Sequence, residues 1–281
     1  MSGERVLVTG AGGLLGPYLV AACRSLGQVI TSGRRSGSRP CDLTDVEGVR
    51  SLIAETRPTV VVHAAAMTDV DLCQQRPDLA EALNEVATEN LASGLPEDTQ
   101  LVMVSTDQVY PDVPGPHREP AVGPVNVYGE TKLAAEETVL GRLRGLVLRT
   151  NFFGPSRSSG RQSLSDFVVG RLRAGDPVVL FEDVLFSPLH MATFASLLAL
   201  AVSTGLSGVY NVGCRSGASK AAFGMAVARH LSLTTNSVTL GRSRGVPGRA
   251  PRPLDLRMDV SRLEMALGRP MPMLDDEVAK L

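Results

Sequence analysis

A tyrosine and a lysine lie four residues apart in the stretch VYGETK, at Tyr128 and Lys132. On a helix, residues four apart share one face, with Cβ atoms roughly 5–6 Å apart, so both side chains can point into one cleft. A free tyrosine has a pKa of about 10, which is about three units too high for efficient proton exchange at neutral pH. A nearby ammonium favours the phenolate, so Lys132 is expected to lower the pKa of Tyr128. The pair predicts a proton donor with an electrostatic partner.

Two hydroxyl residues, Ser105 and Thr106, stand at the end of the apolar stretch QLVMVS. This stretch is typical of a buried strand, expected beside the first strand of a sheet. A hydroxyl at its end can hydrogen-bond a substrate carbonyl and orient it for hydride attack. The tyrosine and lysine alone are also compatible with simple packing on a helix. The hydroxyl residues that precede them in the chain favour a catalytic role for the tyrosine and the lysine.

A glycine-rich segment, TGAGGLLG, follows the first apolar stretch of the chain. Its glycines permit a tight turn and a close backbone approach to a pyrophosphate, and the helix that follows offers free N–H groups to that anion. A glycine-rich turn without a ligand is the alternative, but the position directly after the first strand favours a dinucleotide. The residues assigned to the cofactor here are Gly10, Gly13, Leu14, Leu15 and Gly16.

The predicted second strand ends in SGRR, with Arg34 and Arg35 where a fold that prefers NAD usually carries an acid. A guanidinium there pairs with a 2′-phosphate, so NADP is the preferred cofactor and NAD a possible one. Two solvated surface arginines are the alternative. Asp42, followed by Leu43, is expected at the end of the next strand, where it can reach the adenine amino group or belong to the cap of the next helix.

Short apolar runs alternate with helical patterns through the first half of the chain. The segment from Thr44 to Glu47 has the spacing of a capping box that opens a helix. We expect strands at residues 5–9, 29–32, 59–65, 100–105 and 145–150, helices at residues 14–26, 44–56 and 128–142, and one helix or two at residues 77–95.

Strands that are apolar throughout and separated by helices indicate a parallel sheet covered on both faces. The predicted fold is therefore a doubly wound α/β sheet, the Rossmann fold, in which ligands bind beyond the carboxyl ends of the strands. Residues 1–150 are predicted to form this dinucleotide-binding core. Residues 151–281 are richer in Gly, Pro, Ser and Arg, and are expected to complete the sheet and form a small C-terminal substrate-binding lobe.

The composition excludes several classes of function. With 281 residues, 43% apolar residues and a net charge of -1, the chain is typical of a soluble globular protein and offers no basic surface for nucleic acid or anionic membrane. The four cysteines show no paired spacing, so free thiols are expected and neither a disulfide framework nor a metal site. No signal segment is recognisable, and the longest apolar run, residues 191–202, is too short to span a bilayer. A cytoplasmic location is expected.

The chain resembles the extended short-chain dehydrogenase/reductases over nearly its whole length. The motifs TGAGGLLG, HAAA, STDQVY and YGETK occur in the order and spacing of that family. Within the family, the segments AAMTDVD, PVNVYGETKLAAEE, RTNFFG and PRPLDLRMDV are most similar to reductases of nucleotide-linked sugars. The resemblance implies NADPH-dependent reduction of a ketone in a nucleotide-linked sugar, by a chain that can form a homodimer.

The resemblance also implies roles for individual residues. Thr106 would orient the carbonyl, Tyr128 would donate the proton, and Lys132 would tune Tyr128 and bind the nicotinamide ribose. The remaining positions are Ala64, Ala65 and Ala66, which would line the cofactor groove, and Asp107 and Phe152, which would contact the sugar nucleotide.

Two departures from relatives bear on the reaction and the substrate. Sugar-nucleotide dehydratases carry Asp-Glu after the threonine, whereas this chain has Asp107 and Gln108. Glutamine cannot act as the base for water elimination, so elimination is disfavoured. Close reductases carry Tyr at position 108 and Trp at position 152, which leaves the identity of the sugar open. No metal is predicted.

Two other functions are compatible with the same scaffold. A 4-epimerase would keep the hydride on a tightly held cofactor, but Arg34 and Arg35 disfavour it because such epimerases typically retain NAD. A non-catalytic regulatory subunit is the second, because one relative of these reductases is a partner of a methionine adenosyltransferase. The complete set of Thr106, Tyr128 and Lys132 argues against a loss of chemistry.

A few further residues have two interpretations. His63 and His190 are expected to have structural roles rather than catalytic ones. Arg249 and Arg252 either clamp a diphosphate or are solvated in a Pro-rich loop. The acidic residues 275–277 are expected to form a solvated helix start.

Overall fold

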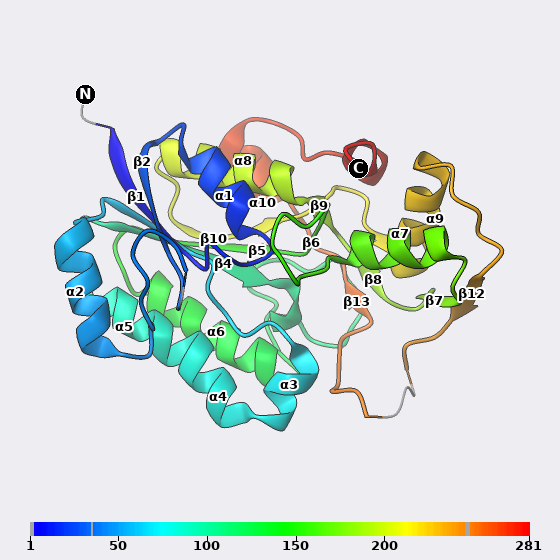
Figure 1. Cartoon of the computed structure of the whole chain (residues 1–281), viewed down its shortest axis with the longest axis horizontal. Helices are drawn as coiled ribbons and strands as arrows, with labels where there is room; N and C mark the ends of the chain where they lie inside the picture. Colours follow the sequence, from blue (N-terminus) through cyan, green and yellow to red (C-terminus); the bar gives the residue numbers. More distant parts are fainter. Residues whose placement is uncertain (1–2, 35, 245–247) are drawn as a thin grey trace.

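The computed structural model describes residues 3–34, 36–244 and 248–281 (Figure 1). In this part of the chain, six parallel strands form a sheet with the order β10-β5-β4-β3-β1-β2. The predicted doubly wound α/β fold is confirmed. The strands are β1 (Glu4–Thr9), β2 (Gly27–Ser32), β3 (Val60–His63), β4 (Gln100–Thr106), β5 (Gly145–Thr150) and β10 (Gly208–Val212).

Both faces of the sheet are covered by helices, which explains why the strands are apolar at successive positions. In β1, Val6 and Val8 belong to one hydrophobic cluster and Leu7 belongs to another on the opposite face. Figure 1 shows α1 (Gly16–Cys23), α8 (Met191–Ser203) and α10 (Ser261–Leu267) on one face, and α2 (Val46–Thr56), α5 (Ala87–Gly94) and α6 (Val127–Leu140) on the other.

The register of the strands brings their carboxyl ends to one edge. Thr9 is aligned with Ser32 of β2 and with His63 of β3. Thr106 of β4 is aligned with Thr150 of β5. The chain segments that leave these strands therefore start side by side, at the edge where α/β sheets bind ligands.

The predicted helix at 77–95 contains a π-helical turn. It consists of α4 (Pro77–Glu81), a π turn (Ala82–Val86) and α5, and is preceded by α3 (Val70–Gln75). Asn84 lies in the π turn, where its side-chain nitrogen donates to Thr131 Oγ1 at 3.0 Å. The π turn thereby fixes this helix against α6, which carries Tyr128.

The second half of the chain completes the sheet with β10 and builds a lobe beside it. In Figure 1 the lobe lies to the right of the sheet. Its helices are α7 (Leu164–Ala174), α9 (Lys220–His230) and α11 (Leu274–Val278). Its short strands pair as β6 (Phe152–Phe153) with β9 (Leu189–His190), β7 (Val178–Phe181) with β12 (Val238–Gly241), and β8 (Leu185–Phe186) with β11 (Ala218–Ser219) and β13 (Asp255–Leu256).

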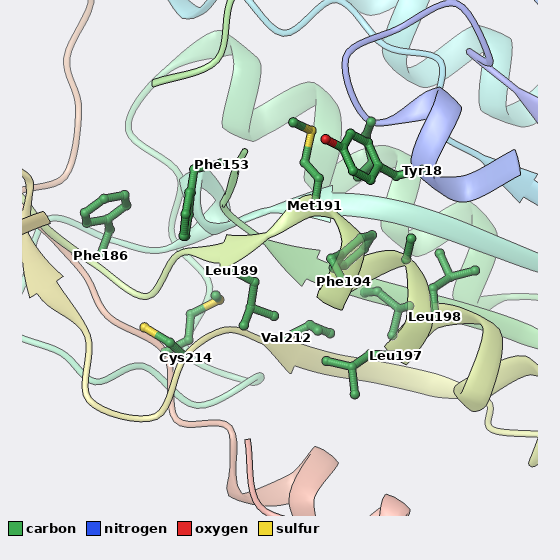
Figure 2. Packing of buried hydrophobic residues seen from close by; sticks show 14 of the residues in the cluster. Tyr18, Phe153, Phe186, Leu189, Met191, Phe194, Leu197, Leu198, Val212 and Cys214 are labelled. Carbon is green, nitrogen blue, oxygen red and sulfur yellow. The ribbon is translucent and has the colours of Figure 1, made fainter. Parts of the chain in front are cut away.

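One continuous hydrophobic cluster joins the lobe to the Rossmann layer. Figure 2 shows Phe153 and Phe186 of the lobe in the same packed layer as Met191 and Phe194 of α8. The ring centroids of Phe153 and Phe223 lie 4.8 Å apart in an edge-to-face arrangement, a geometry that aromatic pairs favour. The lobe is therefore part of the same core, and the residues that it presents toward the sheet are held rigidly.

Three local expectations differ from the structure. The helix expected at 14–26 spans only Gly16–Cys23. The capping box predicted from Thr44 to Glu47 is wrong, because the side chain that caps α2 is Asp45, which accepts from Glu47 N at 3.2 Å. The strand expected to end at Asp42 is absent from the described residues around it, which lie in loop and turn.

The acidic residues 275–277 are only partly solvated. Asp275 and Asp276 are exposed, but Glu277 is fully buried, so the expectation of a solvated helix start is wrong for that residue. Glu277 accepts from His190 N at 2.8 Å and from Thr193 Oγ1 at 3.1 Å. His190 also caps α8, and therefore has the structural role that was predicted.

Among the described residues, no helix is both long and apolar enough to cross a membrane.

Candidate active site

A cleft of about 1120 Å³ runs along the carboxyl ends of five neighbouring strands. Its lining includes Thr9 of β1, Ser32 of β2, Ala64 after β3, Thr106 of β4 and Thr150 of β5. The glycine-rich loop and Tyr128 line the same cleft. The structure thus brings the predicted cofactor residues and the predicted reacting residues into one cavity.

The glycine-rich loop approaches the backbone of other segments too closely for side chains. Gly10 has φ +69°, and a Cβ there would lie 2.6 Å from Ala65 N. A Cβ at Gly16 would lie 2.2 Å from a carbonyl oxygen of the same loop. The N–H groups of Leu14 and Leu15 donate to no other group of the described residues, and α1 has no side-chain cap. These open donors fit a pyrophosphate. All five predicted residues line the cleft: Gly10, Gly13, Leu14, Leu15 and Gly16.

The opposite end of the cofactor region carries Arg34, Asp42 and Leu43. Arg34 Nε lies 3.6 Å from Asp42 Oδ2, and the Arg34 side chain is 55% exposed. Asp42 also accepts from Thr44 N at 3.1 Å, and the hydrogen bonds from Thr44, assisted by Arg34, lower its pKa. Asp42 therefore belongs to the turn before α2, and its contact with an adenine stays a prediction. Arg35 lies outside the described residues.

The reacting centre depends on a glycine in α6. The helix begins after Asn126, which accepts from Gly129 N at 2.9 Å. A Cβ at Gly129 would lie 2.3 Å from Gln108 O, so only glycine allows α6 to approach the turn after β4 this closely. Tyr128 and Thr106 then line the same cleft, as predicted.

The ionisation of Tyr128 differs from expectation. Burial raises the pKa of the Tyr128 phenol above its ordinary value of 10.0, and the nearby Thr106 hydroxyl only partly opposes this rise. The predicted lowering by Lys132 is not found, because desolvation outweighs the favourable contacts and the ammonium is directed elsewhere. Tyr128 is consequently a protonated phenol at neutral pH, the state that a proton donor requires.

Lys132 lies in the cleft on the same face of α6 as Tyr128. Its Nζ donates to Val104 O of β4 at 2.9 Å. Burial lowers the pKa of Lys132 to about 8, while Glu136 opposes this shift. The lysine thus loses its charge at a lower pH than an ordinary lysine, and a shifted pKa of this kind is common at functional sites.

The two adjacent hydroxyl residues of β4 have different partners. Ser105 donates to a carboxylate oxygen of Glu136, which also binds Arg149 at 2.5 Å in an ion pair with side chains 3% and 1% exposed. Thr106 Oγ1 instead accepts from Gln108 N at 3.2 Å, donates to Asp107 Oδ1 at 3.3 Å and lines the cleft together with Tyr128. Of the two hydroxyls, Thr106 is therefore the one placed for substrate.

His63 lies behind the cofactor groove and is fully satisfied. Its Nδ1 lies 2.8 Å from Thr9 Oγ1 and its Nε2 lies 3.1 Å from Thr88 Oγ1. Burial, with a further effect of the Lys132 charge, lowers the pKa of His63 to about 3. The imidazole is therefore neutral, in agreement with the predicted structural role. After His63, the chain lines the cleft with Ala64, Ala65 and Ala66.

Asp107 and Phe152 both line the cleft, and their contact with a sugar nucleotide stays a prediction. Asp107 is buried, and its Oδ2 accepts from Asn151 Nδ2 at 2.8 Å. Burial raises the pKa of Asp107, while the hydrogen bond from Asn151 opposes the rise. Gln108 contacts Asp107 at 3.4 Å and Asn126 at 3.3 Å, so its amide is engaged in the wall of the site.

The two arginines of the Pro-rich loop line the cleft and have different partners. Arg252 forms two hydrogen bonds of 2.9 Å with Asp71 of α3, which also accepts from Ala250 N at 2.8 Å. Arg252 is therefore anchored rather than solvated. Arg249 has its guanidinium carbon 5.5 Å from the centre of the Phe181 ring. A contact of either arginine with a diphosphate stays a prediction.

The segment after β6 crosses to the glycine-rich loop. Tyr18 of α1 donates to Pro155 O at 2.6 Å, and Ser158 Oγ donates to Gly13 O at 2.8 Å. These bonds place Arg161 in the lining of the cleft. A cation there can approach the phosphates that the glycine-rich loop receives.

Sequence reasoning missed Asn151, Arg161 and Lys220, all of which line the cleft. Asn151 directly follows the predicted strand at 145–150, so the rule that ligands bind beyond strand ends would have found it. Arg161 and Lys220 lie in segments without a clear period or motif, where the sequence carries no comparable signal.

The sheet order, the glycine-rich loop and the Thr106, Tyr128 and Lys132 set define a Rossmann-fold protein of the short-chain dehydrogenase/reductase type. Residues 4–281 match the family described as RmlD substrate binding domain, and the chain belongs to this family. The resemblance found in the sequence is thus confirmed. The sugar-nucleotide reductases to which the motifs are most similar are, by name, the dTDP-4-dehydrorhamnose reductases.

Relatives of known sequence carry several functional names. The probable low-salt glycan biosynthesis reductase Agl14 of Haloferax volcanii is 30% identical, over 98% of this chain and 96% of its own length. A dTDP-4-dehydrorhamnose reductase of Streptomyces griseus is 37% identical, over 74% of this chain and 68% of its own. Methionine adenosyltransferase 2 subunit beta of Xenopus laevis is 29% identical, over 96% of this chain and 84% of its own.

Solved structures reproduce the fold over its whole length. A dTDP-4-dehydrorhamnose reductase from Bacillus anthracis in complex with NADP has a TM-score of 0.90 and 23% identity, and the match covers 98% of this chain and 97% of that one. A hypothetical dTDP-4-dehydrorhamnose reductase from Sulfolobus tokodaii has a TM-score of 0.85 and 28% identity, covering 96% and 98%. A UDP-glucose 4-epimerase from Thermus thermophilus in complex with NAD has a TM-score of 0.80 and 27% identity, covering 98% of both.

Proposed function

We propose that this chain reduces a ketone in a nucleotide-linked sugar, with NADPH as the cofactor. The observation that carries the proposal is the convergence of Thr106 and Tyr128 in one cleft with the glycine-rich loop, with Lys132 beside them. The names of the reductases in the family support the substrate class. The protein is expected to act in the cytoplasm, and to form a homodimer.

The proposed chemistry divides between cofactor and protein. NADPH supplies the hydride that is added to the carbonyl carbon. Thr106 and Tyr128 donate hydrogen bonds to the carbonyl oxygen and stabilise the charge that develops there. Tyr128 then gives its proton to that oxygen, and the raised pKa of its phenol keeps the proton available at neutral pH. Lys132, whose Nζ also donates to Val104 O at 2.9 Å, would hold the nicotinamide ribose with its ammonium.

Elimination of water from the sugar is not part of the proposed reaction. A dehydratase needs a base beside the acid that follows the threonine, and this chain offers the amide of Gln108 at that place. The amide donates toward Asp107 at 3.4 Å and accepts from Asn126 at 3.3 Å. A side chain with no ionisable proton and two protein partners cannot remove a proton from carbon at neutral pH.

The test is NADPH oxidation by the purified chain with dTDP-4-dehydrorhamnose, and with UDP- and GDP-linked 4-ketosugars, in parallel with NADH. Tyr128→Phe should lose most of kcat while NADPH binding, measured by fluorescence titration, stays within about twofold. Thr88→Val, which alters a hydroxyl on the far side of His63, is the control for damage to the fold. Turnover of Tyr128→Phe at the parent rate would refute the mechanism.

Two other functions follow from relatives and give different results in the same assay. The similarity to methionine adenosyltransferase 2 subunit beta favours a regulatory subunit, which would bind NADPH, oxidise none with any ketosugar and copurify with a larger enzyme. The similarity to a UDP-glucose 4-epimerase favours epimerisation, which would give copurified NAD and no net oxidation. Net NADPH oxidation that depends on a ketosugar excludes both as the main activity.

A further inference from the structure

Lys220 is a cation of the cleft that the proposed chemistry leaves without a role. It is the first residue of α9, and its backbone N–H donates to Val184 O at 2.9 Å. The preceding Ser219 caps the helix by accepting from Ala222 N at 3.0 Å. The backbone of Lys220 is therefore fixed, and its side chain extends from a rigid element of the lobe into the substrate end of the cleft.

The Lys220 ammonium is surrounded by charges that do not pair with it. It forms no hydrogen bond or ion pair with the described residues, although Asp107, Arg249 and Arg252 all act on it electrostatically. Of these charges, Arg252 is bound to Asp71 at 2.9 Å. The carboxylate of Asp107 accepts from Asn151 instead.

The arrangement is electrostatically unfavourable by itself. Lys220, Arg249 and Arg252 repel one another, and burial together with this repulsion lowers the pKa of Lys220 and of Arg249. A cation in the first turn of a helix also opposes the helix dipole, which favours anions at that end. Lys220, Arg249 and Arg252 line this end of the cleft together with one carboxylate, Asp107. A second carboxylate, Asp71, is bound to Arg252, so positive charge is in excess here.

We propose that Lys220, together with Arg249, binds the diphosphate of the sugar nucleotide. The inference rests on the proposed function, because a nucleotide-linked sugar carries two adjacent phosphates between its sugar and its nucleoside. Lys220 lines the same cleft as Asp107, which follows Thr106 in the chain, and as the two arginines of the Pro-rich loop. A diphosphate bound there leaves its sugar at Thr106 and Tyr128, and removes the repulsion among the cations.

The experiment measures the binding of dTDP, UDP and GDP by calorimetry with NADPH present, so it requires no turnover. Lys220→Met should lower the affinity for the nucleoside diphosphate that binds best by about tenfold or more. The affinity of Lys220→Arg should stay within about threefold of that of the parent protein. Arg229→Met changes an exposed cation near the other end of the same helix and should leave the affinity unchanged. The Tm of Lys220→Met should equal or exceed that of the parent, because the variant removes repulsion.

Other outcomes overturn the proposal. Nucleoside diphosphate affinity of Lys220→Met within twofold of the parent would mean that Lys220 does not hold the diphosphate. A raised KM for dTDP-4-dehydrorhamnose with unchanged dTDP affinity would assign Lys220 to the sugar instead. Failure of the parent protein to bind dTDP, UDP or GDP would also refute it. A parent that binds one of them but reduces no ketosugar would refute the reductase function alone, because the Lys220 comparison can still be made.

Discussion

The Lys132 ammonium donates to the carbonyl oxygen of Val104 at 2.9 Å, so the lysine is held against β4 directly before the two hydroxyl residues of the site. Burial lowers the pKa of Lys132 to about 8, and the Glu136 carboxylate opposes the shift. A lysine with an unshifted pKa of 10.5 would stay charged over the whole working range of the protein. This one loses its charge within that range, which gives the reaction a pH dependence.

We expect kcat/KM for ketosugar reduction to fall as the pH rises above about 8, because Lys132 then loses the charge with which it is proposed to hold the nicotinamide ribose. The burial that raises the pKa of Tyr128 keeps the phenol protonated in this range, so the decrease belongs to Lys132. The measurement is kcat/KM from pH 6 to pH 10, because its pH dependence reports the pKa values of groups in the free protein. In Lys132→Arg, whose charge persists, the remaining activity should not decrease near pH 8. A parent profile that is flat to pH 9.5 contradicts the assignment.

Substitutions of the adjacent residues Ser105 and Thr106 should have different effects, one on stability and the other on catalysis. Thr106→Val removes a donor to the carbonyl oxygen and should lower kcat by about a hundredfold, the usual cost of losing one such donor. Ser105→Ala removes the hydrogen bond to Glu136, and should lower the free energy of unfolding by about 1–2 kcal/mol while changing kcat less than about threefold. Steady-state kinetics and urea unfolding of both variants test this split. Equal losses of kcat would show that the two hydroxyls do not have separate roles.

The NADP preference should depend on Arg34. Its side chain is 55% exposed and its pair with Asp42 spans 3.6 Å, so losing the pair costs little stability. Arg34→Met should raise KM for NADPH by about tenfold and leave KM for NADH within about twofold, because only NADPH carries the 2′-phosphate. Arg39→Met is a matched control, since Arg39 is 57% exposed and pairs with Glu55 at 3.4 Å outside the cleft. If KM rises equally for NADPH and NADH, Arg34 does not bind the 2′-phosphate.

The sequence allowed the Rossmann core to be predicted because strands such as β1, β3 and β4 contain runs of apolar residues and end at residues that can do chemistry. Position alone then placed Gly10, Thr106, Tyr128 and Lys132 in one cleft, because parallel strands end at the same edge. The protonation of Tyr128 could not be predicted in this way. It depends on how completely the phenol is buried and where the nearby ammonium is directed, and both are properties of the packed structure.

The lobe was less predictable for a different reason. Its strands are two to four residues long and pair across large distances in the chain, such as Phe186 with Ala218 and with Leu256. Segments this short carry no hydrophobic period, and Lys220 directly follows one of them, β11, so its place in the cleft could not be predicted from a pattern. The burial of Glu277 is likewise a property of the fold, because its donors, the backbone of His190 and the Thr193 hydroxyl, lie more than 80 residues away in the chain.

The buried pair of Arg149 and Glu136 links the stability of the fold to the ionisation of the site. Arg149→Met leaves the Glu136 carboxylate in the core with Ser105 as a remaining donor, and should lower the free energy of unfolding by about 3–5 kcal/mol. Arg149→Met combined with Glu136→Leu removes both charges and should recover a large part of that loss, because no unpaired charge remains buried. Urea unfolding measures both.

An exposed pair supplies the control, and the pH profile supplies a second readout. Arg171→Met breaks a bond of 3.1 Å to Asp176 between side chains that are 44% and 49% exposed, and should cost less than about 1 kcal/mol. Because Glu136 opposes the lowering of the Lys132 pKa, its removal in the double variant should move the decrease in kcat/KM to lower pH. A stable double variant whose profile is unchanged would show that Glu136 supports the fold without setting the charge of Lys132.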